Sequence, residues 1–121
     1  MEAIELLLSA NPRQLPEKEY KITSLSEETG GDVVFKLRAL PYNRAAEIKR
    51  GNTEDMNIDI ILAGVVSPDL RNQALLEKYG AVTPAEMLKK LLLPGELDEI
   101  AMRIEQLSGY RLTLTEEVKK N

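Results

Sequence analysis

The chain lacks cysteine, histidine and tryptophan altogether. Without cysteine there is no disulfide, no thiolate nucleophile and no cysteine-bound zinc. Without histidine the chain also lacks the commonest metal ligand and general base of proteins. We therefore expect no catalytic, cofactor-binding or metal-binding residue, and no enzyme activity.

Aromatic residues and long apolar runs are scarce as well. Four tyrosines and one phenylalanine are too few for the stacking platforms that bind single-stranded nucleic acid. The opening residues MEAIELLLSA contain a brief apolar run, but glutamates stand where a signal peptide has basic residues. No run approaches the ~20 apolar residues that cross a bilayer. We expect a cytoplasmic protein with no membrane as partner.

The composition that remains is that of an ordinary soluble domain. The 121 residues are 43% hydrophobic and 30% charged, which predicts one domain, residues 1–121, with a modest aliphatic core. The net charge of −4 and the isoelectric point near 5.0 disfavour nucleic acid as the main partner, because neutralising phosphates requires a basic face.

Two kinds of periodicity divide the first 40 residues. Apolar residues at helical spacing predict an N-terminal helix over residues 1–12, which Asn11-Pro12 ends. Its apolar face must either dock on the rest of the chain or be offered to a partner. Residues 19–40 alternate and predict a β-hairpin with one buried face and a turn at Gly30-Gly31. Its inward-facing residues are Tyr20, Ile22, Val33, Phe35, Leu37 and Ala39.

Residues 43–110 form the predicted helical part. Asn43 is expected to cap a first helix that Gly51 closes, and Thr53 to cap a second that runs to Val66. The β-branched residues of this second segment leave a strand as the alternative. Ser67-Pro68 is expected to start a third short helix, which Gly80 ends.

The strongest helix signals lie near the end of this part. Thr83-Pro84-Ala85-Glu86 has the form of a capping box with proline at the first helical position. A further helix follows Pro94 and ends at Ser108-Gly109, with one apolar stripe that comprises Leu97, Ile100, Ala101, Ile104 and Leu107. Residues 111–121 are expected to form a polar tail or a final short helix.

These elements predict an α+β protein. The N-terminal helix and the hairpin are expected to pack against a bundle of short helices, since neither a two-stranded hairpin nor helices this short are stable alone.

Charged clusters are the remaining candidates for chemistry. Adjacent acids occur at Glu27-Glu28, Glu54-Asp55, Asp98-Glu99 and Glu116-Glu117. We interpret them as solvated positions, because neighbours on a helix diverge by about 100°. The basic residues Arg44, Lys49 and Arg50 are interpreted as a solvated helix face, with contact to a phosphate or an acidic partner as the alternative.

A second functional hypothesis is a small prophage-encoded DNA-binding regulator. Two helices with a tight turn over residues 83–108 could form a helix-turn-helix. The second of these helices carries four acids and one arginine, however, and DNA phosphates repel an acidic helix.

Several motifs in the second half of the chain resemble the XkdN-like family of phage tail assembly chaperones. They are V-x-P-x-L at Val66 to Leu70, Y-G at Tyr79-Gly80, T-P-A-E-M-L-K-K-L-L-L-P-G-E from Thr83 to Glu96, and L-S-G-Y from Leu107 to Tyr110. The most specific part is P-G-E after a leucine-rich helix, followed about a dozen residues later by S-G and an aromatic residue.

The resemblance implies a non-enzymatic role in the infected or lysogenic bacterial cell. Such proteins bind the long tape measure protein, assist assembly of the tail tube around it, and are absent from the finished virion. The implied partner is the tape measure protein, with the tail tube protein or a second copy of the chain as further partners. The family carries no set of binding residues to this sequence, so none is named.

Overall fold

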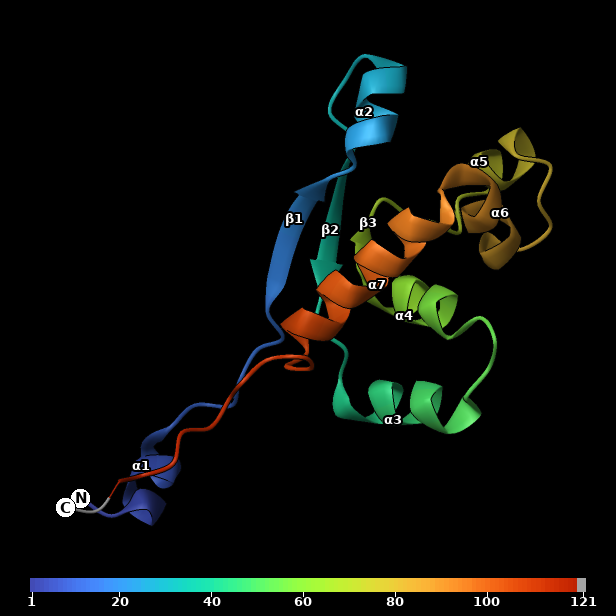
Figure 1. Cartoon of the computed structure of the whole chain (residues 1–121). Coiled ribbons are helices and arrows are strands. Elements are labelled where there is room, and N and C mark those ends of the chain that lie inside the picture. Colours follow the sequence, from blue (N-terminus) through green and yellow to red (C-terminus); the bar gives the residue numbers. More distant parts are fainter. Residues whose placement is uncertain (120–121) are drawn as a thin grey trace.

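A computed structural model of the chain describes residues 1–119, and within them it has seven helices and one three-stranded antiparallel sheet (Figure 1). The α+β class predicted from the sequence is confirmed. In chain order the elements are α1 Ala3–Ser9, β1 Glu17–Lys21, α2 Thr23–Thr29, β2 Val34–Arg38, α3 Tyr42–Gly51, α4 Met56–Gly64, β3 Val65–Ser67, α5 Gln73–Lys78, α6 Pro84–Leu91 and α7 Pro94–Leu107.

The central strand of the sheet is β2, which pairs with β1 on one side and with β3 on the other. Its alternation places Phe35 and Leu37 in the core, as the sequence predicted, and leaves Val34 on the solvent side. The pairing with β1 extends past the strand end, because the Ile22 backbone N–H donates to the Val33 carbonyl at 2.9 Å. The face of the sheet that carries Phe35 and Leu37 is the one that the helices cover.

Helix α7 is the element that joins the sheet to the other helices. It contacts β2 and α4, and α4 in turn contacts α3 and α6. A close approach between α4 and α7 depends on Gly64, since a Cβ built there would lie 2.6 Å from Cγ2 of the fully buried Ile104. Leu88, Leu92 and Ile100 are also buried, and the predicted apolar stripes of α6 and α7 form the core.

The start of α6 has the predicted threonine cap, but the glutamate bonds one residue further upstream than in a capping box. The Thr83 hydroxyl accepts a hydrogen bond from the Glu86 N–H at 3.1 Å, and the Glu86 carboxylate accepts one from the Val82 N–H at 2.9 Å. The Val82 N–H, with help from Thr83, Lys90 and Lys89, holds the pKa of Glu86 below its ordinary value. The cap therefore favours the charged form of this glutamate.

The predicted hairpin is present, but its connection is not a turn. Residues expected to lie in the second half of a strand and in a loop form helix α2, and Gly30 (φ 79°) ends that helix instead of making a hairpin turn. The buried Ser26 ties the insertion together, because its hydroxyl donates to the Ile22 carbonyl at 2.8 Å and accepts from the Val33 N–H at 2.9 Å. The alternation predicts the strand correctly up to Ile22, but the prediction extended the strand into residues that form α2.

The predicted helix from Thr53 to Val66 is wrong at both ends. Helix α4 begins at Met56, and the Thr53 hydroxyl donates to the Asp59 carboxylate at 3.1 Å. After Gly64 the chain forms β3, because the β-branched pair that follows finds a partner in β2. The strand that the sequence left as the alternative for this segment is thus present only at its end, in β3.

The start of α5 and both ends of α3 also differ from the predicted helix ends. Ser67-Pro68 does not start a helix; the peptide bond is cis, and α5 begins at Gln73 with the Asn72 side chain accepting from the Leu75 N–H at 3.0 Å. Helix α3 starts before Asn43, the predicted cap, with Pro41 in the N-cap position. Its C-cap is Asn52 (φ 41°), one residue beyond the predicted Gly51.

The predicted packing of the N-terminal helix on the bundle is also wrong. Helix α1 has no buried residue, and it lies apart from the rest of the molecule at the end of an extended segment (Figure 1). Residues 113–119 of the tail are extended and exposed and form no helix. Lys120 and Asn121, which belong to the predicted tail, lie outside the described residues.

Candidate functional site

Two of the four adjacent acid pairs supply a surface contact between elements. Asp55 accepts a hydrogen bond from the Lys89 ammonium at 3.0 Å, and Asp98 accepts one from the Asn57 amide at 2.7 Å. Across residues 1–119, no three acidic side chains converge to form a place for a metal ion.

The predicted basic cluster on α3 is partly engaged within the chain. Arg44 pairs with Glu47 at 3.3 Å, and the Lys49 ammonium lies 3.6 Å from the centre of the Tyr110 ring. Arg50 is exposed at the end of the helix. The three residues therefore do not form one joint anion site.

The helix that would have to read DNA is unsuited to it. Ile100, Ala101 and Ile104 of α7 are buried against the body, so the helix can present only its opposite face. That face carries the acids Asp98 and Glu99, which DNA phosphates repel. The arrangement of α6 and α7 is a packing unit of the core.

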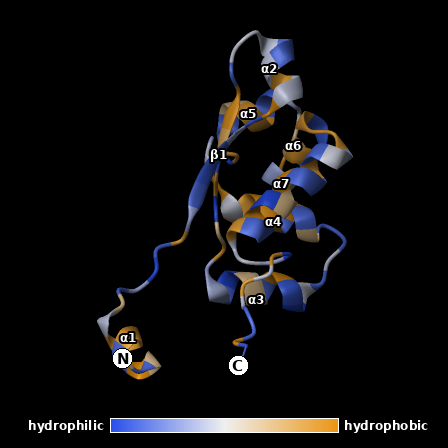
Figure 2. Ribbon diagram, turned by 60° about the vertical axis from the view of Figure 1, so that its left-hand side comes forward, coloured by the Kyte–Doolittle hydropathy of each residue, from blue (hydrophilic) through white to orange (hydrophobic). Residues whose placement is uncertain are grey.

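Helix α1 exposes all of its large apolar side chains. Ile4, Leu6, Leu7 and Leu8 are each more than half exposed, and Leu7 and Leu8 reach 70% and 79%. Figure 2 shows α1 as a largely apolar ribbon set apart from the body. Exposed apolar residues concentrated in this way are typical of surfaces that bind another molecule.

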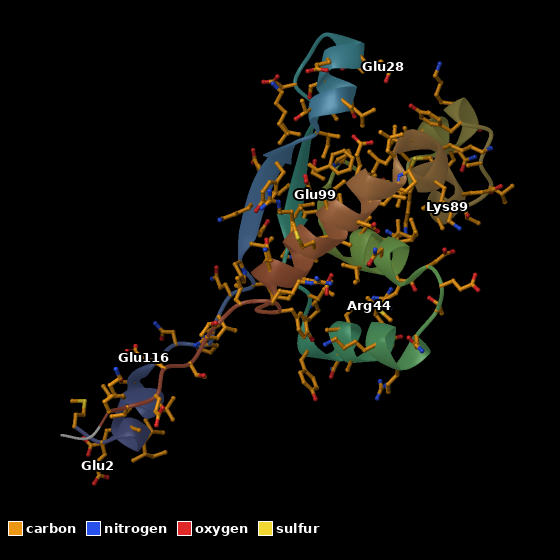
Figure 3. All side chains as sticks on the ribbon, in the orientation of Figure 1. Glu2, Glu28, Arg44, Lys89, Glu99 and Glu116 are labelled. Atoms are coloured by element: carbon orange, nitrogen blue, oxygen red, sulfur yellow. The ribbon has the colours of Figure 1, made fainter. Side chains whose placement is uncertain are left out.

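The segment that carries α1 leaves the body beside the start of the tail. Residues 13–16, Leu112 and Leu114 line one cavity of about 600 Å³ together with Ala39, Leu40 and residues 106–109. The extremities lie far from α2: Glu2 and Glu116 are at one end of the molecule and Glu28 is at the other (Figure 3). The protein thus has one end with two exposed arms.

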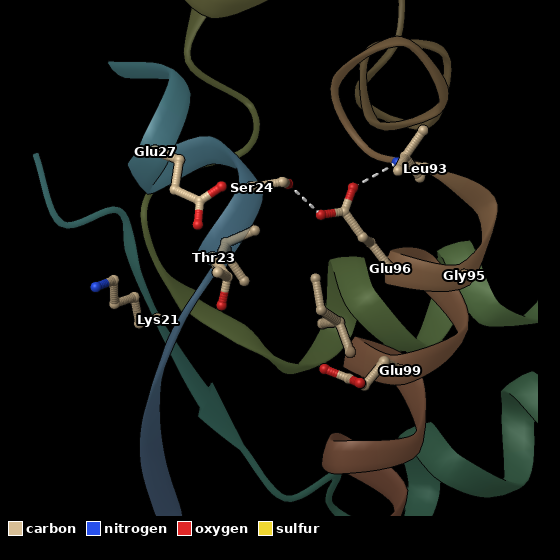
Figure 4. A pocket seen from close by; sticks show the side chains of 10 residues that line it. Lys21, Thr23, Ser24, Glu27, Leu93, Gly95, Glu96 and Glu99 are labelled. Carbon is tan, nitrogen blue, oxygen red and sulfur yellow. Dashed lines mark hydrogen bonds between the residues drawn. The ribbon is translucent and has the colours of Figure 1, made fainter. Parts of the chain in front are cut away.

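A groove opens at the opposite end, between α2 and the start of α7. It has a volume of about 500 Å³, and its apolar surface comes from Ile22, Leu93 and Ile100. Glu27 of α2 and Glu99 of α7 stand on its two sides, with Glu96 between them (Figure 4). We refer to these lining residues, with Lys21, Thr23, Ser24 and Gly95, as the α2–α7 groove.

Glu96 joins the two walls of the α2–α7 groove. Its carboxylate accepts hydrogen bonds from the Ser24 hydroxyl and, at 2.7 Å, from the Leu93 N–H. Lys21, the only basic residue that lines the groove, pairs with Asp32 at 3.4 Å. The groove is therefore an apolar surface with an excess of negative charge.

Sequence reasoning left two roles open for the apolar face of α1, packing on the rest of the chain or contact with a partner, because a core helix and a binding helix have the same pattern. The α2–α7 groove was missed because its walls are about 70 residues apart in the chain and one of them, α2, was read as a loop. A signal for the end of α2 exists in Gly30, which closes the helix in the left-handed conformation.

None of the helices within residues 1–119 combines the length and the hydropathy that crossing a membrane requires.

Comparison with solved structures identifies the fold in another protein. The crystal structure of the protein YqbN, a structural genomics target, superposes with a TM-score of 0.69, covering 91% of this chain and 98% of that one at 20% identity. This likeness concerns the fold. A search of curated proteins gives no significant match.

The family comparison adds the functional assignment. The profile described as phage XkdN-like tail assembly chaperone protein matches residues 47–120, which is more than half of the chain and runs from the end of α3 through the tail. The motifs from Val66 to Tyr110 lie inside this match. The chain therefore belongs to the XkdN-like family of phage tail assembly chaperones.

Proposed function

We propose that the protein is a non-enzymatic chaperone that holds the phage tape measure protein through helix α1 while the tail tube assembles around it. It acts in the cytoplasm of the bacterial host and is absent from the finished virion. The observation that carries the proposal is the exposure of every large apolar side chain of α1.

The apolar surface of α1 complements the apolar surface expected on the tape measure protein. A long helical tape measure chain exposes apolar stripes before the tube encloses it, and such stripes aggregate when left uncovered. A short apolar helix on an extended arm can pack along a stripe as one helix packs along another. Because α1 is short and marginal by itself, its binding is reversible, as release of the tape to the tube requires.

Co-expression with the tape measure protein tests this proposal. The double variant Leu7→Asp/Leu8→Asp should lose the tape measure protein on affinity purification, whereas the wild type should retain it. Val82→Asp is the matched control, since Val82 is 85% exposed but lies on the body. All three proteins should unfold at the same denaturant concentration, because exposed substitutions change stability by less than about 0.5 kcal/mol.

Retention of the tape measure protein by the double variant would show that α1 is not the contact. A wild-type protein that fails to co-purify with the tape measure protein and binds duplex DNA in a salt-sensitive way would instead support the regulator hypothesis.

A further inference from the structure

We propose that the α2–α7 groove is a second docking site, which takes an apolar segment of a partner protein that carries lysine or arginine beside its apolar residues. This inference deepens the proposed function, because the client is a natural source of such a segment.

The first argument is the unused charge at the groove. Within the described residues, neither Glu27 nor Glu99 takes part in an ion pair, and Figure 4 shows the two side chains on opposite sides of the opening. Lys21 does not neutralise them, because it pairs with Asp32. An incoming ammonium or guanidinium group between the two carboxylates would gain favourable electrostatic interactions, whereas a carboxylate would be repelled.

The second argument is the presence of leucine at a position that favours a polar residue. Leu93 is the N-cap of α7, where serine, threonine, asparagine or aspartate would accept a hydrogen bond from the first turn and stabilise the helix by about 1 kcal/mol. The neighbouring helices α5 and α6 have Asn72 and Thr83 in this role. Leu93 supplies no such bond and is 65% exposed, so its side chain contributes little to folding and is available to a partner at the rim of the groove.

The third argument concerns which segment fits. The exposed apolar helix of the chain itself is a poor occupant, because α1 carries Glu5, follows Glu2 and has no lysine or arginine. The volume of about 500 Å³ lies within the range of sites that hold ligands, and the floor formed by Ile22 and Ile100 is preformed by the core. The charge and the shape together favour a basic apolar segment from another protein.

Only one wall of the groove lies within the match to the family profile. Residues 93–100 lie within the match to the family profile, whereas residues 21–27 lie outside it.

Two designed peptides test the site without the natural client. The first is a helical peptide with a leucine stripe flanked by lysines, and its twin has glutamates in place of the lysines. In amide NMR spectra of the full chain, the lysine peptide should shift residues 21–27 and 93–100, and the glutamate twin should not. Equal responses to both peptides, or shifts confined to other residues, would overturn the proposal.

Charge-neutral variants give the quantitative test. Glu27→Gln/Glu99→Gln should weaken binding of the lysine peptide by roughly two- to thirtyfold, since each exposed charge pair contributes modestly. Glu116→Gln/Glu117→Gln, which removes the same charge from the tail, is the control and should leave the dissociation constant unchanged. Equal dissociation constants for the groove variant and the wild type would overturn the charge argument, and a dimer of the free protein that the groove variant abolishes would assign the groove to a second copy.

The groove proposal and the proposed function of α1 can fail independently of each other. The α1 variant Leu7→Asp/Leu8→Asp should bind the lysine peptide as the wild type does. A protein that fails to retain the tape measure protein but shows the predicted peptide shifts would keep the groove and lose the role of α1, and the reverse result would do the opposite.

Discussion

Helices α1 and α7 both carry an apolar stripe, but only α7 buries it. Helix α7 buries Ile100, Ala101 and Ile104 against the sheet and α4, whereas α1 buries none of its residues. The difference lies in what surrounds them. Helix α7 is 14 residues long and is reached through a tight turn from α6, while α1 has 7 residues and is separated from the body by an extended segment. Apolar periodicity indicates that a face will be covered, but it does not say whether the cover is the same chain or another one.

The largest expected effect sharpens this comparison by truncating one side chain on each helix. Ile104→Ala should lower the free energy of unfolding by about 2–5 kcal/mol, because it leaves a cavity between α7 and α4. Leu7→Ala should change it by less than about 0.5 kcal/mol, because Leu7 is exposed. Urea denaturation of both variants measures the two values. A comparable loss in both would mean that α1 packs on the body in solution.

A smaller effect is expected at Gly64 of α4, which packs against Ile104 of α7. Gly64→Ala should destabilise the protein by about 1–3 kcal/mol, because the added methyl group overlaps Ile104. Helix propensity alone predicts the opposite sign, a gain of about 1 kcal/mol. The double variant Gly64→Ala/Ile104→Ala should lose at least about 0.5 kcal/mol less than the sum of the single losses, since the truncation makes room. Strict additivity in urea denaturation would contradict the close approach.

The smallest effect concerns the starts of α6 and α7. Leu93→Ser should raise the free energy of unfolding by about 0.5–1 kcal/mol by supplying the missing side-chain cap of α7. Thr83→Ala, which removes the existing cap of α6, should lower it by about 0.5–2 kcal/mol. Thermal unfolding of the two variants gives the comparison. If Leu93→Ser destabilised the chain, the leucine would have a packing role that its exposure does not indicate.

The elements predicted correctly are those whose signals are local. Thr83 and Glu86 fix the start of α6 through bonds within one turn, and a regular stripe defines α7. The alternation in β2 likewise identifies Phe35 and Leu37 as core residues.

The elements that were missed depend on distant partners or on overlapping signals. Strand β3 exists because β2 is beside it, so Val65 and Val66 alone could be assigned equally to the end of a helix. Helix α2 interrupts an alternation that is correct up to Ile22. The α2–α7 groove could not be predicted at all, since it requires both α2 and its position next to Glu96.

The segment between α1 and β1 sets how far the exposed helix can travel. Residues 10–16 form no helix or strand, and seven residues of extended chain span up to about 23–25 Å. Strand β1 has five residues and is about 17 Å long, so the arm is longer than the distance along the strand toward the α2–α7 groove. If α1 binds a client as proposed, the rest of that client would be held near the groove at an effective concentration in the millimolar range. The second contact would then be an intramolecular step, and two weak sites could together hold a client that each releases quickly.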